Sequence, residues 1–213
     1  MHIPDGFVAI PINAAMFALS GAACGWAARK SRQELEERQA PLLGVTAAFI
    51  FAAQMLNFPI AAGTSGHFLG AGLAFVLLGP WNSCLIMAMV LIIQCLGFAD
   101  GGLSALGTNI FNMGVVGGLG GYYIFRLLQK FLPRTRGGFM TAVAFSAWLS
   151  VVLAAGFCAL ELGLSGTLAL PVVLPAMVSV HAVIGVGEAL ITTAVISVVL
   201  ASRRDLVSAY QGL

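Results

Sequence analysis

Long apolar runs make up most of this chain, and short polar or charged segments separate them. A helix needs about 20 apolar residues to cross about 30 Å of hydrocarbon, because each residue adds about 1.5 Å. Most of the runs reach or approach that length, which predicts membrane-spanning helices. The predicted spans are residues 7–28, 41–57, 65–79, 82–98, 103–131, 139–162 and 174–201.

The third and fourth spans are short and meet at Gly79-Pro80-Trp81, so they could also form one broken element. Charge decides between six and seven spans, because positive residues beside spans stay on the cytoplasmic side. With seven spans and the N-terminus outside, all ten basic residues lie inside, whereas six spans would separate the first group from the others. The groups are Arg29, Lys30, Arg32 and Arg38; Arg126, Lys130, Arg134 and Arg136; and Arg203 and Arg204.

Composition supports this interpretation. The 213 residues are 60% hydrophobic and 8% charged, whereas soluble domains carry about 25% charged residues. We therefore expect an all-α polytopic membrane helix bundle that forms one domain over residues 1–213, with an outer tail at residues 1–6 and a cytoplasmic C-terminus. The four cysteines form no C-x-x-C pair and are expected to be small packing residues.

The usual catalytic and nucleotide-binding motifs are missing from the sequence. It has no G-x-x-x-x-G-K-[ST] loop for ATP phosphates, no H-E-x-x-H helix and no G-x-S-x-G turn. We therefore expect neither an enzyme nor a nucleic-acid-binding protein. The residues left to carry chemistry are His2, His67, His181, the intramembrane Glu188 and a few amides.

The first two residues, Met1 and His2, have the donor atoms of a metal chelate. The free amine of Met1, the backbone nitrogen of His2 and its imidazole Nδ1 would close a five-membered and a six-membered ring on one ion. Three nitrogens then lie nearly in a plane, and Ni(II) and Cu(II) favour such tetragonal nitrogen sets, whereas Zn(II) prefers a tetrahedron. An ordinary frayed terminus is the alternative.

His67 is the candidate for the fourth nitrogen, because the predicted topology places it on the same outer side as His2. It follows a Gly-Thr-Ser-Gly stretch suited to a tight turn, in which Thr64 or Ser65 could cap the next helix. Thr64 and Ser65 are therefore candidates for supporting the site. A histidine that is only hydrogen-bonded in a helix cap is the alternative.

Two further sets of residues have a structural and a functional interpretation. His181 and Glu188 are seven residues apart and share a helix face. His181 could orient a metal ligand or hold the bundle together, and for Glu188 we expect a structural hydrogen bond to another helix. Gly21 and Gly25 have the small-xxx-small spacing of a helix-packing face, either within the bundle or for a partner subunit.

Four stretches of the sequence carry a resemblance to a known family: MHIPDGF, NFPIAAGTSGHFLGAGLAFVLLGPW, GFADGGLSALGTNIFNMG and HAVIGVGEALIT. Together they resemble the CbiM/NikM family, the substrate-binding (S) components of nickel or cobalt energy-coupling-factor transporters. The likeness runs from Met1 to about residue 191.

The resemblance implies that Ni²⁺ or Co²⁺ is bound in a square-planar set made by the Met1 amine, the backbone and side-chain nitrogens of His2, and His67. It also implies partners: a transmembrane coupling (T) component, cytoplasmic ABC-type ATPases and in some systems a small auxiliary membrane subunit. The implied location is the cytoplasmic membrane of a bacterium or archaeon.

Several alternatives stay open. The planar nitrogen set favours nickel over cobalt, but the same scaffold would serve cobalt for cobalamin synthesis. A stand-alone channel or secondary carrier would tend to show inverted repeats, which we do not find in the sequence. A purely structural membrane subunit would leave Met1, His2 and His67 unexplained.

Overall fold

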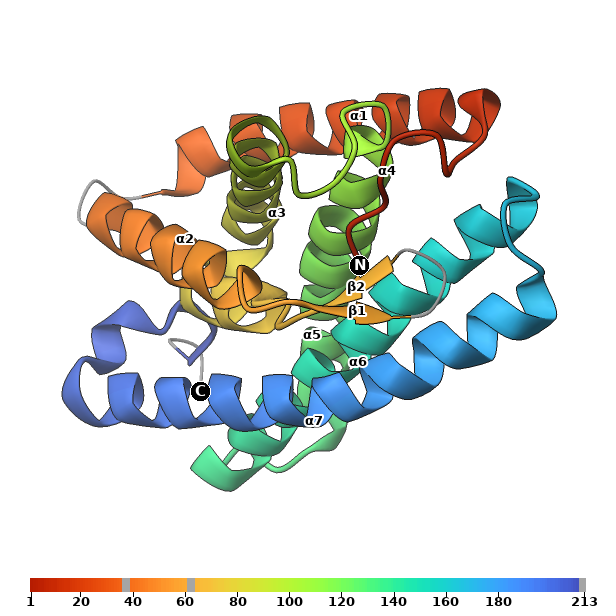
Figure 1. Cartoon of the computed structure of the whole chain (residues 1–213). Helices are drawn as coiled ribbons and strands as arrows, with labels where there is room; N and C mark the ends of the chain where they lie inside the picture. Colours follow the sequence, from red (N-terminus) through yellow and green to blue (C-terminus); the bar gives the residue numbers. More distant parts are fainter. Residues whose placement is uncertain (36–38, 61–63, 211–213) are drawn as a thin grey trace.

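The computed structural model describes residues 1–35, 39–60 and 64–210, and its described part is mostly helical (Figure 1). A π-helical segment, Phe111–Gly120, joins α4 to α5, and β1 and β2 form an antiparallel pair. The elements are α1 (Ile10–Glu34), α2 (Ala40–Gln54), β1 (Phe58–Ile60), β2 (Thr64–Gly66), α3 (Ala71–Phe98), α4 (Leu106–Ile110), α5 (Gly121–Phe131), α6 (Arg136–Leu164) and α7 (Leu170–Ser202).

The predicted fold class, a helical membrane protein, is confirmed. Four helices, α1, α3, α6 and α7, are long and apolar enough to cross a membrane, and α2 is a shorter apolar helix. Many large apolar side chains point outward, among them Trp26, Leu96 and Val183, as expected for a surface that faces lipid. The number of crossings and the orientation of the termini remain predictions.

Several predicted boundaries differ from the observed helices, and two of these differences bear on the candidate site. Residues 65–70 were expected to begin a helix, but Ser65 and Gly66 pair with β1 and the following residues are extended. Gly70 has a φ of +83°, so the helix begins only at Ala71. The N-terminal tail is also longer than expected, because α1 begins at Ile10 with a proline in its first turn.

The chain reverses direction inside α3. Gly79 has φ +81° and ψ 176°, which is not helical, and Pro80 follows it. The Ser83 hydroxyl donates a hydrogen bond to the Ala71 carbonyl at 3.3 Å, whereas residues twelve apart in a straight helix are about 18 Å apart. The two parts of α3 therefore fold back on each other at the boundary between the third and fourth predicted spans.

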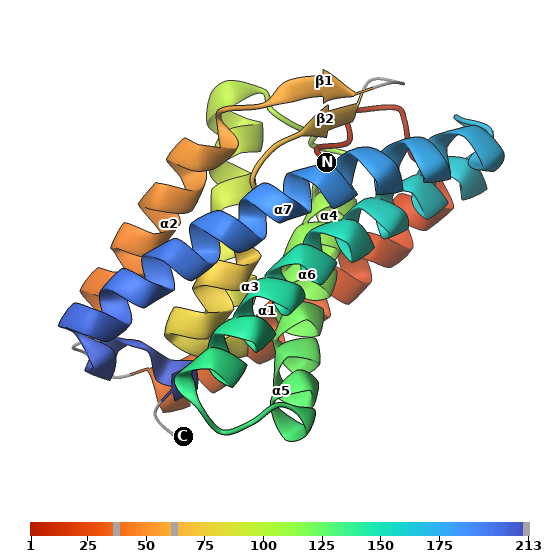
Figure 2. The same cartoon turned by 90° about the horizontal axis from the view of Figure 1, so that it is seen from below.

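The molecule has two different ends, which Figure 2 shows clearly. Met1, β1 and β2 lie at one end, which we call the site end. The C-terminus and the α5–α6 connection lie at the other, where Tyr210 packs on Phe139 with ring centroids 4.7 Å apart. We call this the basic end, because Arg136 begins α6 there and Arg204 lies over the Tyr210 ring. Arg38, from the first basic group, lies outside the described residues.

Helices α6 and α7 run antiparallel along much of their length (Figure 2). The Trp148 indole N–H donates to the Ala182 carbonyl at 3.0 Å, and a Cβ at Gly185 would lie 2.8 Å from the Trp148 ring. These two contacts of Trp148, with Ala182 and Gly185, fix the side of α7 that faces the interior. That side carries His181 and Glu188, both of which are buried.

Candidate metal site

The N-terminal tail lies inside the protein rather than in solvent. Met1 and Ile3 are fully buried, and His2 is 4% exposed. The side-chain amide of Asn109 binds the Ile3 backbone twice, accepting from its N–H at 2.9 Å and donating to its carbonyl at 3.1 Å. The Gly102 N–H also donates to that carbonyl, at 2.9 Å. The tail therefore has a fixed path.

The turn between α3 and α4 is shaped to receive the tail. A Cβ at Gly102 would lie 2.3 Å from the Asp5 backbone nitrogen, so only glycine fits there without a shift. The Asp5 carboxylate accepts hydrogen bonds from the Ser104 N–H at 2.7 Å and from the Ser104 hydroxyl at 2.6 Å. These bonds lower the pKa of Asp5, so this contact persists in mild acid.

The Met1 amine meets the strand that leads to His67. It donates to the Ser65 carbonyl and lies 3.3 Å from the Ser65 hydroxyl. Burial lowers the pKa of this amine from 8.0 to about 5, because the charged form loses its hydration. At neutral pH the amine is therefore unprotonated and its lone pair is available to a ligand.

The two outer histidines face each other, with ring centroids 4.7 Å apart. The Gln94 carbonyl oxygen lies 3.0 Å from Nε2 of His2, so that nitrogen must carry the proton and donate it. In the same way, Nδ1 of His67 donates to the Phe68 carbonyl at 2.8 Å. Each ring then presents an unprotonated nitrogen, Nδ1 of His2 and Nε2 of His67.

Both unprotonated nitrogens are buried and lack a hydrogen-bond partner among the residues that the structure describes. Buried polar atoms are normally paired, so an unpaired one calls for an explanation such as an ion. Burial also lowers the pKa of both rings, that of His2 to about 4 and that of His67 well below its usual value. Neither ring holds a second proton that would repel a cation at neutral pH.

The loop that carries His67 is fixed by two buried side chains. Glu188 from α7 accepts the N–H groups of Leu69 and Gly70, both at 2.8 Å, and Gln54 from α2 donates to the Leu69 carbonyl at 2.6 Å. A carboxylate at these positions also satisfies free N–H groups before α3. The expected hydrogen bond of Glu188 is present, although it reaches this loop rather than another helix.

Three other residues were predicted to support the site: Ser65, Thr64 and His181. Ser65 contacts the Met1 amine instead of capping a helix, and for Thr64 only the backbone position in β2 is described. His181 donates from Nδ1 to the Met177 carbonyl at 2.8 Å, and its buried Nε2 has no described partner. His181 is near enough to His67 to lower the pKa of that ring.

The arrangement offers nitrogen donors, two of them from the main chain. No group of three or more His, Cys, Asp or Glu side chains within the described ranges could hold a metal ion. The nitrogen donors that lie together here are the Met1 amine, the His2 backbone nitrogen and the two imidazole rings. Such a donor set suits transition metals and not Mg²⁺ or Ca²⁺, which need oxygen ligands.

The sequence named the candidate ligands but gave no role to the residues that contact them. Gln54, Gln94 and Asn109 were visible as amides in apolar runs, and each is fully or almost fully buried and hydrogen-bonded to the tail or to the His67 loop. A polar side chain inside an apolar run was the available signal, because such a group must find a partner away from water.

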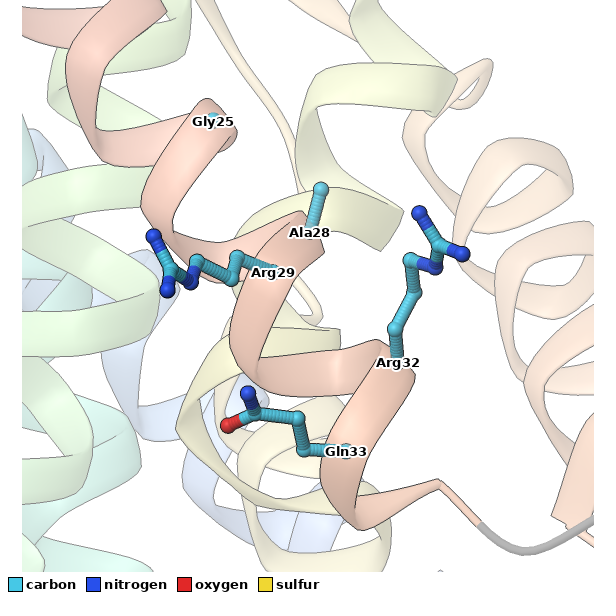
Figure 3. A pocket seen from close by; sticks show the side chains of 5 residues that line it. All are labelled: Gly25, Ala28, Arg29, Arg32 and Gln33. Carbon is cyan, nitrogen blue, oxygen red and sulfur yellow. The ribbon is translucent and has the colours of Figure 1, made fainter.

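A pocket of about 550 Å³ at the basic end is not part of this site. It is lined by Gly25, Ala28, Arg29, Arg32 and Gln33, and Figure 3 shows the two arginine side chains pointing away from each other on α1. Positive guanidinium groups disfavour a cation, so this pocket does not suit a metal ion. Gly21 and Gly25 have open space around them, so they do not pack against other parts of the described bundle.

Comparison with known proteins places the chain among metal transport proteins. The family model described as the cobalt uptake substrate-specific transmembrane region, CbiM, matches residues 2–206. A putative fused nickel transport protein NikMN of Archaeoglobus fulgidus is 44% identical over 97% of this chain and 68% of its own length. The cobalt transport protein CbiM of Sorangium cellulosum is 33% identical over 99% of this chain and 96% of its own.

A solved structure has the same fold. The crystal structure of a truncated transition metal transporter superposes with a TM-score of 0.88 at 33% sequence identity, covering 94% of this chain and 99% of that one.

Proposed function

Because this chain belongs to the CbiM family of nickel and cobalt transport membrane proteins, we propose that it is the substrate-binding component of an ATP-driven nickel importer. The ion would be held by the Met1 amine, the deprotonated backbone nitrogen of His2, Nδ1 of His2 and Nε2 of His67. The observation that carries the proposal is the pair of facing imidazoles with two buried, unpaired nitrogens beside a buried amine.

The donor set supports nickel as the first candidate and cobalt as the second. Four nitrogens in one plane suit Ni(II), and a deprotonated amide strengthens that preference. Cobalt remains the alternative, because relatives of this chain are named for either metal. A stand-alone channel or carrier is a more distant alternative.

The sequence lacks the phosphate-binding loop of an ATPase, so energy for import would come from separate subunits. We therefore propose a transmembrane coupling component and a pair of cytoplasmic ATPases as partners, with a small auxiliary membrane subunit in addition. The setting would be the cytoplasmic membrane of a bacterium or archaeon.

Nickel binding by the purified protein tests the proposal. Two variants each remove one of the four donors: His67→Ala, and the addition of three residues ahead of Met1, which turns its amine into an amide and leaves the histidine too far from the new terminus to chelate with it. We expect each to lower nickel affinity at least 100-fold and to abolish the absorption band of the planar complex, while three residues added after Leu213 change neither. If the N-terminally extended protein binds nickel with the wild-type spectrum, the ligand set is wrong.

A further inference from the structure

The ligand nitrogens are buried, so an arriving ion must first meet something nearer to solvent. Met1 is 0%, His2 4% and His67 1% exposed. The carboxylate of Asp100 is both partly exposed, at 18% of its side chain, and close to a ligand, with Oδ1 3.6 Å from Nδ1 of His2. Asp100 therefore joins the protein surface to the buried site.

The contact between Asp100 and His2 brings together two atoms that can only accept. Nε2–H of His2 donates to Gln94, so Nδ1 carries a lone pair, and the carboxylate oxygen carries negative charge. Among the described residues nothing donates to Nδ1. A separation of 3.6 Å is less than two metal–ligand bonds of about 2.0–2.2 Å each, so one cation can touch both atoms.

The turn after α3 holds Asp100 in this position at a conformational cost. Ala99 has a φ of +54°, and it is the one non-glycine residue in the described chain with a positive φ. The Asp100 N–H then donates to the Gln94 carbonyl at 3.0 Å, on the same residue whose side chain orients His2. Left-handed backbone at a residue with a Cβ is unfavourable, and it concentrates at functional positions.

The two carboxylate oxygens of Asp100 are in different surroundings. Asn57 donates from its side-chain amide to Oδ2 at 3.3 Å, which leaves Oδ1 directed at His2. Asp5 is an exposed carboxylate on the tail at the same end, and its Oδ1 is occupied by two hydrogen bonds from Ser104. Of these two rim carboxylates, only Asp100 faces a ligand nitrogen.

We propose that Asp100 is the entry ligand of the site, which first holds a hydrated divalent transition-metal cation between its Oδ1 and Nδ1 of His2 before the ion moves into the four-nitrogen set. The inference rests on the proposed function, because it takes Nδ1 of His2 as one of the final donors. Once the planar set is complete, Asp100 is no longer needed to hold the ion. Its effect is therefore on the rate of binding.

Stopped-flow mixing of Ni²⁺ with the purified full chain tests the proposal. Asp100→Asn keeps the shape and one acceptor for Asn57, and Asp5→Asn is the matched control, since it removes the same charge from the same rim while Oδ1 still accepts from Ser104. We expect Asp100→Asn to slow association about tenfold, with the wild-type dissociation rate and final spectrum. Asp5→Asn should change the association rate less than threefold, and Asp100→Glu should restore most of it.

Each other result overturns the inference. Equal slowing in both Asn variants, removed by added salt, would mean that charge at the rim only steers the ion. Unchanged association in Asp100→Asn would remove any role in entry, and faster dissociation would make Asp100 a permanent ligand. A wild-type protein that binds no nickel at all would instead refute the proposed function, so the two failures are distinguishable.

Discussion

The N-terminal tail is irregular but largely buried, whereas the helix that follows it is regular but mostly exposed. Residues 1–9 form no helix or strand, yet Met1 and Ile3 are completely buried. Helix α1 is regular over 25 residues, yet only 17% of its most apolar window is buried. The irregular segment is thus the interior one, and the helix lies at the surface.

The buried positions of α1 sharpen this contrast, because most of them are polar. They are Asn13, Ser20, Ala27 and Ser31. Ser20 donates to the Gly107 carbonyl at 2.7 Å and Ser31 to Asn82 at 2.6 Å, while Trp26 points outward. In a membrane the apolar side of a helix can face lipid, and polar groups must find partners inside the protein. Polar positions therefore mark the protein interior here.

The largest expected effect comes from forcing the tail out of its place. In Gly102→Ala, the new Cβ would lie 2.3 Å from the Asp5 nitrogen and 2.6 Å from the Pro4 carbonyl carbon, so the tail backbone must move. Overpacking of about 3 kcal/mol corresponds to about a 100-fold loss of nickel affinity. Isothermal titration of the purified variant measures the loss.

Gly25→Ala is the matched control on α1, because its Cβ would have nothing within 4 Å. We expect wild-type nickel affinity for it, together with slightly higher helix stability. Wild-type affinity in Gly102→Ala would show that the tail is not held by this turn.

A smaller loss is expected from Gln94→Leu, which removes the acceptor for Nε2–H of His2. The ring is then free to carry its proton on Nδ1, the atom needed by the ion. Groups that orient metal ligands in this way are typically worth 10–100-fold in affinity, and we expect about tenfold here. Gln94→Glu keeps an acceptor and should restore most of the affinity.

Gln33→Leu serves as the control for Gln94→Leu, since Gln33 is exposed at the basic end of α1 (Figure 3). It should bind nickel like the wild type. Equal losses in both glutamine variants would indicate a general effect of the substitution instead of a role for Gln94 in orienting His2.

The contrast between tail and helix also shows how far the sequence predicts this molecule. Apolar length was enough to predict the long helices. The chemistry of a Met-His start made Met1 and His2 candidate ligands, and the predicted topology added His67. The hairpin of β1 and β2 was not predicted, because three-residue strands in a Gly- and Ala-rich stretch have no periodic signal. The burial of the tail depends on residues about 100 positions away, such as Gly102 and Asn109, which no local pattern connects to it.

The pH dependence of binding separates a buried tail from an exposed one. The pKa of the Met1 amine is lowered to about 5 and that of His2 to about 4, so neither group has a proton to lose at pH 6.5–8. Only the His2 backbone N–H is then released when the ion binds. Nickel affinity should therefore rise about tenfold per pH unit over this range.

In an exposed Met-His terminus the amine would keep a pKa near 8.0 and the ring near 6.5, so more than one proton would be displaced and the dependence would be steeper. Competition titrations at pH 6.5, 7.0 and 7.5 measure the slope. A slope near two in the wild-type protein would contradict the burial of the amine. Gly102→Ala should show the steeper slope, because its tail is displaced into water.

The smallest expected effect on nickel binding comes from the outward face of α1. In Gly21→Leu the new side chain meets nothing within 4 Å at its Cβ, so we expect less than a twofold change in nickel affinity. The same variant should lose the coupling subunit on co-purification if this small-residue face docks a partner helix. Gly187→Leu, at another open glycine on α7, is the control for a bulky residue on the bundle surface.

Unchanged recovery of the coupling subunit with Gly21→Leu would exclude this face as the dock. Loss of nickel binding would contradict the separation of tail and helix, because α1 would then act on the site through its exposed side.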